Sequence, residues 1–338
     1  MARVHNFNPG PSALPLAALE RAAREMIDFE GSGMSIMEHS HRGKVYDAVH
    51  EEAFSLVRKL MGVPDTHEIL FLTGGATQQF AQVPLNLRAP EQSADYIVGG
   101  VWGKKAHKEA AHLGKARVVH STEQNGKFFR VSRNDELSFD PNAAYVHITS
   151  NNTVMGTQVF EFPDTGKVPL VCDMSSDIVS REFDVSRFGL IYAGAQKNMG
   201  PSGITVVIVR KDLIESGRTD IPYVFQYRTQ AAERSLANTC PTFSIYMLRN
   251  VLSWLDEQGG VPAIAKINEQ KAKILYDLLE ERSDVFELSV EKSSRSIMNV
   301  TWNLATPELE ARCVKEATER GLVGLKGHRI VGGLRASL

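Results

Sequence analysis

Short apolar runs alternate with longer amphipathic stretches along the chain from residue 68 to about residue 200. Runs such as 68–72 and 94–98 are typical of buried strands, and apolar residues at every third or fourth position predict helices between them. Further strand-like runs lie at residues 115–120, 143–149, 170–173, 189–193 and 204–209. Strands that alternate with helices predict an α/β protein, in which helices cover both faces of a mostly parallel sheet.

One connection in this pattern is too short for a parallel arrangement. Residues 198–203 join the predicted strands 189–193 and 204–209. A crossover between parallel strands needs about a dozen residues or more. We therefore predict that strand 204–209 runs antiparallel to strand 189–193.

The pattern before this region predicts an arm and two helices. Prolines and a glycine in residues 6–12 exclude a helix or a central strand, so this segment is predicted to be an extended arm. Residues 14–30 and 44–60 have helical periodicity. The first helix is predicted to carry Leu16, Leu19, Ala23, Met26 and Ile27 on one face.

The pattern changes again beyond residue 211. Helices are predicted at residues 243–257, 261–281 and 307–320, and a strand at residues 297–302. Gly259 and Gly260 precede the long helix and are typical of a hinge. We therefore predict a large domain at residues 16–258, and a second unit that combines the arm, residues 1–15, with a smaller α/β domain, residues 259–338.

A lysine lies in a turn of small residues between two predicted strands. Lys197 follows the sequence Ala-Gly-Ala-Gln and precedes Asn-Met-Gly-Pro-Ser-Gly. Because glycine and alanine are depleted in strands, this segment is predicted to be a loop at the edge of the sheet. Taken alone, the segment favours a solvent-facing lysine. A lysine in a partly desolvated site can instead form a Schiff base with an aldehyde.

An aspartate ends the strand predicted before that of Lys197. Asp173 closes the run 170–173. Pyridoxal phosphate needs such a pair, because a lysine binds its aldehyde and an acid keeps its ring nitrogen protonated. A helix N-cap is the alternative interpretation of Asp173, and the residue alone does not separate the two roles.

Other residues with useful chemistry also follow predicted strands. Gly74 and Gly75 lie between strand 68–72 and a helix start, where free backbone N–H groups cradle a phosphate. Trp102 lies among glycines after strand 94–98, and it either stacks on a flat ring or caps the core. Ligands of such sheets bind at the carboxyl ends of the strands. The shared placement predicts one ligand site at that edge.

Two basic segments are candidate anion sites. His41 and Arg42 lie among small residues near the start of a predicted helix, and His328 and Arg329 lie in a glycine-rich tail. The planar fork of arginine suits phosphate, whereas its charge disfavours a metal ion nearby. Incidental charge at a helix start is the alternative for the first segment.

The composition narrows the possible partners and location. A net charge of −2 does not favour general binding to nucleic acids or to membrane surfaces. No apolar run approaches the ~18 residues of a membrane helix, and no signal core opens the chain. The scattered cysteines Cys172, Cys240 and Cys313 argue against a disulfide framework and predict a cytoplasmic protein. No basic residue flanks Cys240, so a structural thiol is predicted there.

Several segments together resemble the phosphoserine aminotransferases, which are class-V aminotransferases of pyridoxal-phosphate fold type I. They are residues 8–11 (Asn-Pro-Gly-Pro), 38–43 (Glu-His-Ser-His-Arg-Gly), 192–198 (Tyr-Ala-Gly-Ala-Gln-Lys-Asn), 326–329 (Lys-Gly-His-Arg) and 332–337 (Gly-Gly-Leu-Arg-Ala-Ser). The resemblance implies a mostly parallel seven-stranded sheet with helices on both faces, and a smaller α/β domain. It also implies a homodimer with shared active sites.

The resemblance implies a role for each site residue. Lys197 would bind the aldehyde of pyridoxal phosphate, Asp173 its ring nitrogen and Trp102 its ring face. Thr153 would bond its phenolic oxygen. Its phosphate would contact Ala76, Thr77 and Gln196, joined by Asn238 and Thr239 of the other subunit. The substrate phosphate would contact His41, Arg42, His328 and Arg329, and Arg335 would bind the substrate carboxylate. Family members often carry Gly-Arg where this chain has Ala76 and Thr77, so one positive charge is missing here.

The implied reaction is reversible. 3-Phosphohydroxypyruvate and glutamate give O-phosphoserine and 2-oxoglutarate in serine biosynthesis, with Lys197 as general base and then acid. Many bacterial members also accept the phosphorylated hydroxythreonine of pyridoxal phosphate synthesis. Members continue past Leu338 with about one more helix, so we expect the small domain here to lack it.

Two alternative functions follow from the same cofactor and fold. A cysteine desulfurase or lyase would need a mobile nucleophilic cysteine, and Cys240 and Cys313 do not suit that role. A cofactor-binding protein without turnover would bind pyridoxal phosphate and leave O-phosphoserine unconverted.

Overall fold

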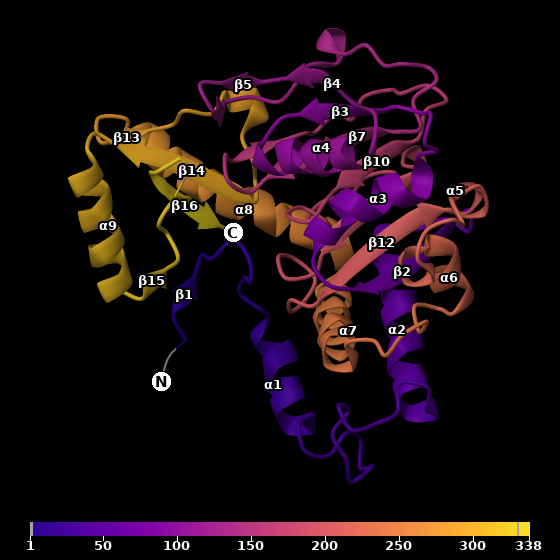
Figure 1. Ribbon diagram of the computed structural model, residues 1–338. Helices are drawn as coiled ribbons and strands as arrows, with labels where there is room; N and C mark the ends of the chain where they lie inside the picture. The colour runs from indigo at the N-terminus through magenta and orange to yellow at the C-terminus, as the bar shows by residue number, and fades with distance from the viewer. Residues whose placement is uncertain (1–2, 330) are drawn as a thin grey trace.

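A seven-stranded sheet forms the centre of the computed structural model, which describes residues 3–329 and 331–338 (Figure 1). Its strand order is β2-β12-β11-β10-β7-β3-β4. The strands are His67–Thr73 (β2), Ala94–Val98 (β3), Ala116–Ser121 (β4), Val146–Thr149 (β7), Leu170–Asp173 (β10), Leu190–Gly194 (β11) and Ile204–Arg210 (β12). Neighbours from β11 to β4 are parallel, whereas β12 is antiparallel to β11 and to β2. The predicted sheet and its antiparallel strand are confirmed.

Helices cover both faces of the sheet because alternate strand residues point to opposite sides. In β2, Ile69 and Phe71 belong to the core that contains α2 and α7, whereas Leu70 and Leu72 belong to the core with α3, α4 and α6. These helices are α2 (Lys44–Met61), α3 (Gln79–Leu87), α4 (Val101–Leu113), α6 (Tyr227–Ala232) and α7 (Thr242–Glu257), with the short α5 at Lys211–Glu215. No helix in the described part of the chain is long and apolar enough to cross a membrane.

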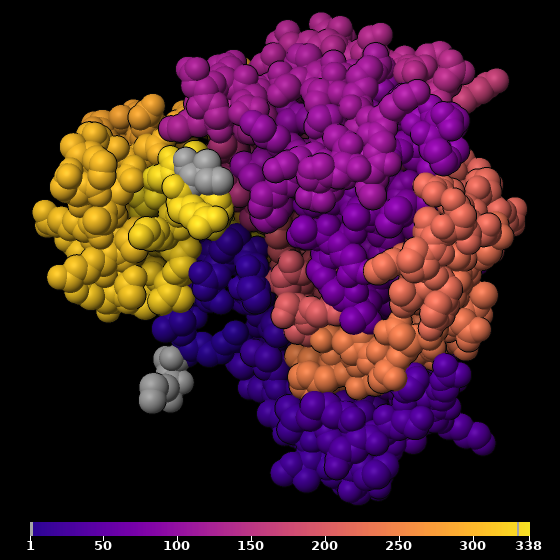
Figure 2. All heavy atoms as spheres, in the orientation of Figure 1, coloured from indigo at the N-terminus to yellow at the C-terminus, as the bar shows by residue number. Residues whose placement is uncertain are grey.

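A smaller lobe lies beside the large sheet (Figures 1 and 2). Its antiparallel sheet has the order β13-β14-β16, and the N-terminal strand β1 pairs in parallel with β15. The elements are β1 (His5–Asn6), α8 (Gly260–Glu281), β13 (Phe286–Glu287), β14 (Asn299–Leu304), α9 (Pro307–Glu319), β15 (Leu322–Val323) and β16 (Leu334–Ser337). Figure 2 shows the arm between this lobe and the large one. The domain boundaries, residues 16–258 against residues 1–15 with 259–338, stay a prediction.

Two hairpins of two-residue strands complete the strands of the fold. They pair β5 (Glu123–Gln124) with β6 (Lys127–Phe128), and β8 (Asn151–Asn152) with β9 (Thr157–Gln158). The second hairpin follows β7 directly at the carboxyl edge of the large sheet. Its turn therefore places residues 153–156 beside the predicted ligand site.

Helix α1 differs from its prediction. It spans Leu16–Glu25 rather than residues 14–30, and it buries Ala18 and Ala22 rather than the larger apolar side chains. Leu16 is 52% exposed and Ile27 is 84% exposed. The small residues allow α1 to lie close to α7, so the larger side chains on its other side have no cover within one chain. The predicted bounds of this helix were therefore wrong, and of its predicted apolar face Leu19 packs against the core.

Candidate active site

Five residues predicted for the site lie at one edge of the large sheet. Strands β2, β3, β7, β10 and β11 run in the same direction, because β2 and β11 are both antiparallel to β12 and the others are parallel to β11. The carboxyl ends of these strands are followed by Gly74, Trp102, Thr153, Asp173 as the last strand residue, and Lys197. The predicted position of the ligand site is consistent with this arrangement.

The amine of Lys197 lies at the centre of this edge. Its Nζ donates a hydrogen bond to Thr153 Oγ1 at 2.7 Å and lies 5.6 Å from the ring centre of Trp102. The pKa of Lys197 is lowered to about 8, chiefly by burial; the charge of Asp173 opposes this lowering, and the charge of Arg335 adds to it. An amine with this pKa is partly neutral near pH 7, so it is able both to attack a carbonyl and to exchange protons.

The N-terminal arm holds the loop of Lys197 in place. The backbone N–H of Ser12 donates to the Gln196 carbonyl at 3.0 Å, and its hydroxyl donates to the carbonyl of Lys197. Gly10 has φ +151°, and a Cβ atom there would lie 2.9 Å from Lys197 Cγ. On the other side, the Asn198 amide donates to the Ile178 carbonyl at 3.0 Å. The lysine therefore projects from a loop fixed on two sides.

Asp173 ends β10 with its side chain buried. Its Oδ1 accepts hydrogen bonds from the Ser175 backbone at 3.0 Å and the Ser175 hydroxyl at 2.6 Å. Burial raises the pKa of Asp173, whereas the charge of Lys197 and the bonds from Ser175 lower it. The chain continues as a turn and not as a helix, so the N-cap alternative is wrong. Among the described residues, Oδ2 has no hydrogen-bond donor, which leaves this oxygen for a cationic ring nitrogen.

The glycine turn after β2 brings the predicted phosphate contacts together. Gly74 has φ +112°, and its carbonyl accepts from Thr205 Oγ1 at 3.0 Å. The turn leads into a short 3₁₀ helix, Ala76–Gln78, and then α3, so its first N–H groups lack helical partners. A Cβ atom on Gly194 would lie 2.6 Å from Gln196 Oε1 and 3.3 Å from Ala76 Cβ. The glycine at 194 thus permits Gln196 to approach the turn.

A basic group faces the same edge from the small lobe. Arg335 in β16 is buried, and its Nη1 donates to the Thr153 carbonyl at 3.2 Å. Its Nε has no hydrogen-bond partner among the described residues. Burial and the positive charges of Arg335, Arg329 and Lys105 lower the pKa of His328. These four residues therefore form one basic group, which suits an anionic substrate.

Sequence reasoning missed Lys105. Its Nζ lies 4.5 Å from the ring centre of Trp102, and its charge reaches His328. The available signal was its position in α4, three residues after Trp102, because residues three apart share one helix face. Ser12 and Ser175 were also missed, because their contacts depend on how distant segments meet.

The structure does not bring all predicted substrate residues together within one chain. Arg42 donates to the Leu236 carbonyl at 3.3 Å and to His41 at 3.4 Å. The loop that carries both residues lies between α1 and α2, well away from β16 and Arg335 (Figure 1). Asn238 donates to Thr73 Oγ1 of its own chain at 3.4 Å, and Thr239 is exposed.

The residues at this edge fit pyridoxal phosphate. Trp102 offers a flat ring beside the amine, since Lys197 Nζ lies 5.6 Å from its centre. The set also includes an amine with a lowered pKa, a buried carboxylate with one open oxygen, and a glycine turn for phosphate. The amine, the carboxylate and the glycine turn therefore match the aldehyde, the ring nitrogen and the phosphate of that cofactor.

The cysteines lack the properties of a mobile nucleophile. Cys240 is buried, and its Sγ lies 3.0 Å from the hydroxyl of Tyr46. Burial raises the pKa of Cys240, Cys172 and Cys313. Because the thiolate is the reactive form, these thiols disfavour the cysteine desulfurase alternative.

Comparisons with known proteins agree with this chemistry. The class-V aminotransferase family model matches residues 4–338. The phosphoserine aminotransferase of Geobacillus kaustophilus is 53% identical over 100% of this chain and 93% of its own. A solved phosphoserine aminotransferase from Bacillus circulans subsp. alkalophilus superposes with a TM-score of 0.97 at 49% identity, covering 99% of this chain and 93% of that one. A pyridoxal-phosphate-bound enzyme of this name from Trichomonas vaginalis gives a TM-score of 0.94 at 36% identity, over 99% and 95% of the two chains.

Proposed function

Because the chain belongs to the phosphoserine aminotransferases of the class-V aminotransferase family, we propose that it transfers an amino group from glutamate to 3-phosphohydroxypyruvate. The products are 2-oxoglutarate and O-phosphoserine; the reaction is reversible, and the direction that forms O-phosphoserine serves serine biosynthesis. The observation that carries the proposal is the position of Arg335 beside the amine of Lys197, since both side chains donate hydrogen bonds to Thr153. The carboxylate and phosphate of one small substrate match this local charge in a chain of net charge −2.

The cofactor is pyridoxal phosphate, whose ring accepts electrons from the substrate α-carbon when it is bound. Lys197 would hold its aldehyde, Asp173 its ring nitrogen and Trp102 its ring face. Thr153 would bond its phenolic oxygen. The phosphate would lie against Ala76, Thr77 and Gln196.

Lys197 moves the proton in this proposal. Its Nζ takes the proton from the substrate α-carbon and returns it on the cofactor side. Both transfers are feasible because its lowered pKa of about 8 leaves neither protonation state strongly favoured near neutral pH. Thr153 orients the amine through the 2.7 Å hydrogen bond.

Substrate selection is assigned to the basic group. Arg335 binds the α-carboxylate that both amino-acid substrates share, with its planar fork. His328 and Arg329 bind the substrate phosphate, which unphosphorylated serine lacks. The burial of Arg335 strengthens its attraction for a carboxylate because little water screens the charges.

A second copy of the chain completes the site in this proposal. His41 and Arg42 would reach the substrate phosphate of the partner, and Asn238 and Thr239 its cofactor phosphate. Two observations support a homodimer. Thr77 in the glycine turn is exposed in one chain, although an anion site gains from exclusion of water. Apolar side chains are also uncovered on α1 and just after it, with Leu16 at 52% exposure and Ile27 at 84%.

The proposed location is the cytoplasm. Cys172, Cys240 and Cys313 are all free thiols. Free thiols without a disulfide framework are typical of proteins from reducing compartments.

The test of the proposed function is turnover by the purified protein. With pyridoxal phosphate present, glutamate and 3-phosphohydroxypyruvate are mixed with the enzyme, and O-phosphoserine is measured by chromatography. We expect O-phosphoserine to form, and hydroxypyruvate to give far less serine. The Lys197→Ala variant is the matched control and should give no product. Sulfide release from cysteine with no O-phosphoserine would instead favour the desulfurase alternative.

A further inference from the structure

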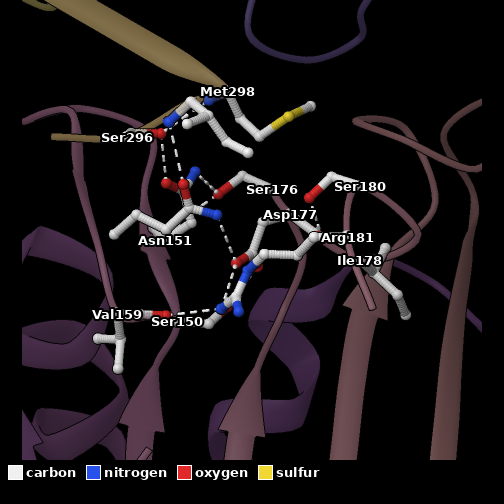
Figure 3. A network of polar contacts seen from close by, with 12 residues as sticks. Ser150, Asn151, Val159, Ser176, Asp177, Ile178, Ser180, Arg181, Ser296 and Met298 are labelled. Atoms are coloured by element: carbon white, nitrogen blue, oxygen red, sulfur yellow. Dashed lines mark hydrogen bonds and ion pairs between the residues drawn. The ribbon is translucent and has the colours of Figure 1, made fainter. Parts of the chain in front are cut away.

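A buried polar cluster joins the loops at the carboxyl edge of the large sheet to the small lobe, two residues before Thr153 in the chain. Its centre is Asn151 in β8, whose Nδ2 donates to Ser176 Oγ at 2.8 Å and to Asn299 Oδ1 at 2.7 Å. The Oδ1 of Asn151 accepts from Ser296 Oγ at 2.6 Å. Figure 3 shows Asn151 between Ser176, in the turn after β10, and Ser296 of the small lobe. Both amide hydrogens are used, so the side chain has one favoured orientation.

Asn299 continues this cluster to the strand that carries Arg335. Its Nδ2 donates to Ser337 Oγ at 2.9 Å, and the two residues are partners in the pairing of β14 with β16. Ser337 is two residues after Arg335, so the two side chains lie on one face of β16. Arg335 itself donates to the carbonyl of Thr153, two residues after Asn151. The same two segments are therefore held together at two points.

Burial makes this connection specific. Asn151 is 2% exposed, Asn299 is 3% exposed and Ser296 is fully buried. Polar groups that are removed from water need hydrogen-bond partners, so a shift of β16 relative to Asn151 would leave one of them unpaired. The proposed mechanism uses none of these groups. Their arrangement instead fixes the place of Arg335 relative to Thr153 and therefore to Lys197.

We propose that Asn299 is a positioning residue for the α-carboxylate site, acting through the link from Asn151 to Ser337. The inference rests on the proposed function, in which Arg335 binds the carboxylate of both amino-acid substrates. Loss of the link weakens the binding of that carboxylate by Arg335, and it therefore lowers the affinity for O-phosphoserine and for glutamate alike. A ligand that lacks the carboxylate is unaffected, because in the proposed function it makes no contact with Arg335.

The test compares Asn299→Ala with Asn303→Ala in the holoenzyme. Asn303 lies on the same strand, but its Nδ2 donates to Ser289 Oγ at 3.0 Å within the small lobe. We expect Asn299→Ala to raise the KM for O-phosphoserine and for glutamate about tenfold each, which is the effect of losing one hydrogen bond between a displaced Arg335 and the substrate carboxylate. The inhibition constant of phosphoethanolamine, which has the amine and phosphate but no carboxylate, should stay constant. Asn303→Ala should change neither.

The visible spectrum of the bound cofactor should be the same in both variants. Equal weakening of O-phosphoserine and phosphoethanolamine by Asn299→Ala would overturn the proposal, because that result indicates a general structural role. An unchanged KM for both substrates would also overturn it. If Asn299→Ala does not fold, Ser337→Ala removes only the hydroxyl that accepts from Asn299. It should raise the ratio of the KM for O-phosphoserine to the inhibition constant of phosphoethanolamine about threefold.

The outcomes separate this inference from the proposed function. A wild-type protein that does not convert O-phosphoserine overturns both. The positioning role alone is overturned if the wild type is active but Asn299→Ala leaves unchanged the ratio of the KM for O-phosphoserine to the inhibition constant of phosphoethanolamine.

Discussion

Lys197 owes its proposed chemistry to its surroundings rather than to its residue type. A lysine in water has a pKa of about 10.4 and is almost fully protonated at neutral pH. Burial lowers the pKa of Lys197 to about 8, and Thr153 fixes the direction of its amine. The sequence predicted the loop, and also Asp173, because both follow strand-like runs. The pKa was not predictable, since it depends chiefly on how deeply the folded chain buries the amine, and also on the charge of Arg335 from a distant strand.

The lowered pKa predicts how cofactor uptake depends on pH. Only the neutral amine attacks the aldehyde, so the rate of uptake by the cofactor-free protein should rise with pH and reach half its maximum near pH 8. Uptake is followed as the increase in visible absorption after adding pyridoxal phosphate. Lys197→Ala is the control for surface lysines. A midpoint near pH 10 would contradict the buried environment of Lys197.

Asp173 is expected to matter for rate more than for binding. Asp173→Asn keeps the shape but loses the charge opposite the ring nitrogen, so kcat should fall about a hundredfold or more while KM changes little. Asp184→Asn is the matched control, because exposed Asp184 accepts the same pair of hydrogen bonds from Ser186. Steady-state kinetics of the two variants give the comparison. Similar losses in both would argue against the role of Asp173.

The elements that carry the site follow from strand order and tight turns. The short connection at 198–203 correctly predicted the antiparallel strand β12, and the glycine turn after β2 opens α3 as expected. Periodicity failed for α1, because it identifies an apolar face but not what covers that face. The hairpin of β8 and β9 was also not predicted, since two-residue strands carry no periodic signal.

The turn of this hairpin depends on Gly156. It has φ +75°, and a Cβ atom there would lie 2.8 Å from the Asn299 carbonyl and 2.7 Å from Thr301 Oγ1. Gly156→Ala should therefore lower the free energy of unfolding by about 2–4 kcal/mol, through strain and overlap. Gly166→Ala is the control, with φ +62° and no atom within 4 Å of its Cβ position. It should cost about 1 kcal/mol. Urea unfolding measures both, and equal losses would contradict the close contact between the lobes.

At the scale of the whole molecule, the residues of the proposed site lie on two lobes, and one chain does not bring all of them together. Arg335 donates a hydrogen bond to Thr153 across the joint of the lobes, whereas the side chain of Arg42, among the described residues, donates only to the neighbouring His41 and to the Leu236 carbonyl. Hydrophobic patterning cannot reveal such a division, because it contains no information on subunit contacts. The resemblance to a family supplied that expectation.

The proposed homodimer predicts that two inactive variants restore each other. Lys197→Ala lacks the amine, and Arg42→Ala lacks the group offered to the partner. A mixed dimer has one site with both residues intact, so random exchange of subunits should restore about a quarter of wild-type activity. The variants are mixed, partly unfolded in urea, refolded together and assayed. Activity that stays at the level of the separate variants would contradict a shared site.

The measurement that tests the central claim most directly is the visible spectrum of the holoenzyme before and after O-phosphoserine is added. Serine is the matched control, because it differs only by the phosphate. The account predicts that O-phosphoserine changes the absorption of the bound cofactor and releases 3-phosphohydroxypyruvate, whereas serine at the same concentration does neither. A coloured protein whose spectrum stays constant with O-phosphoserine, or responds equally to serine, would contradict it.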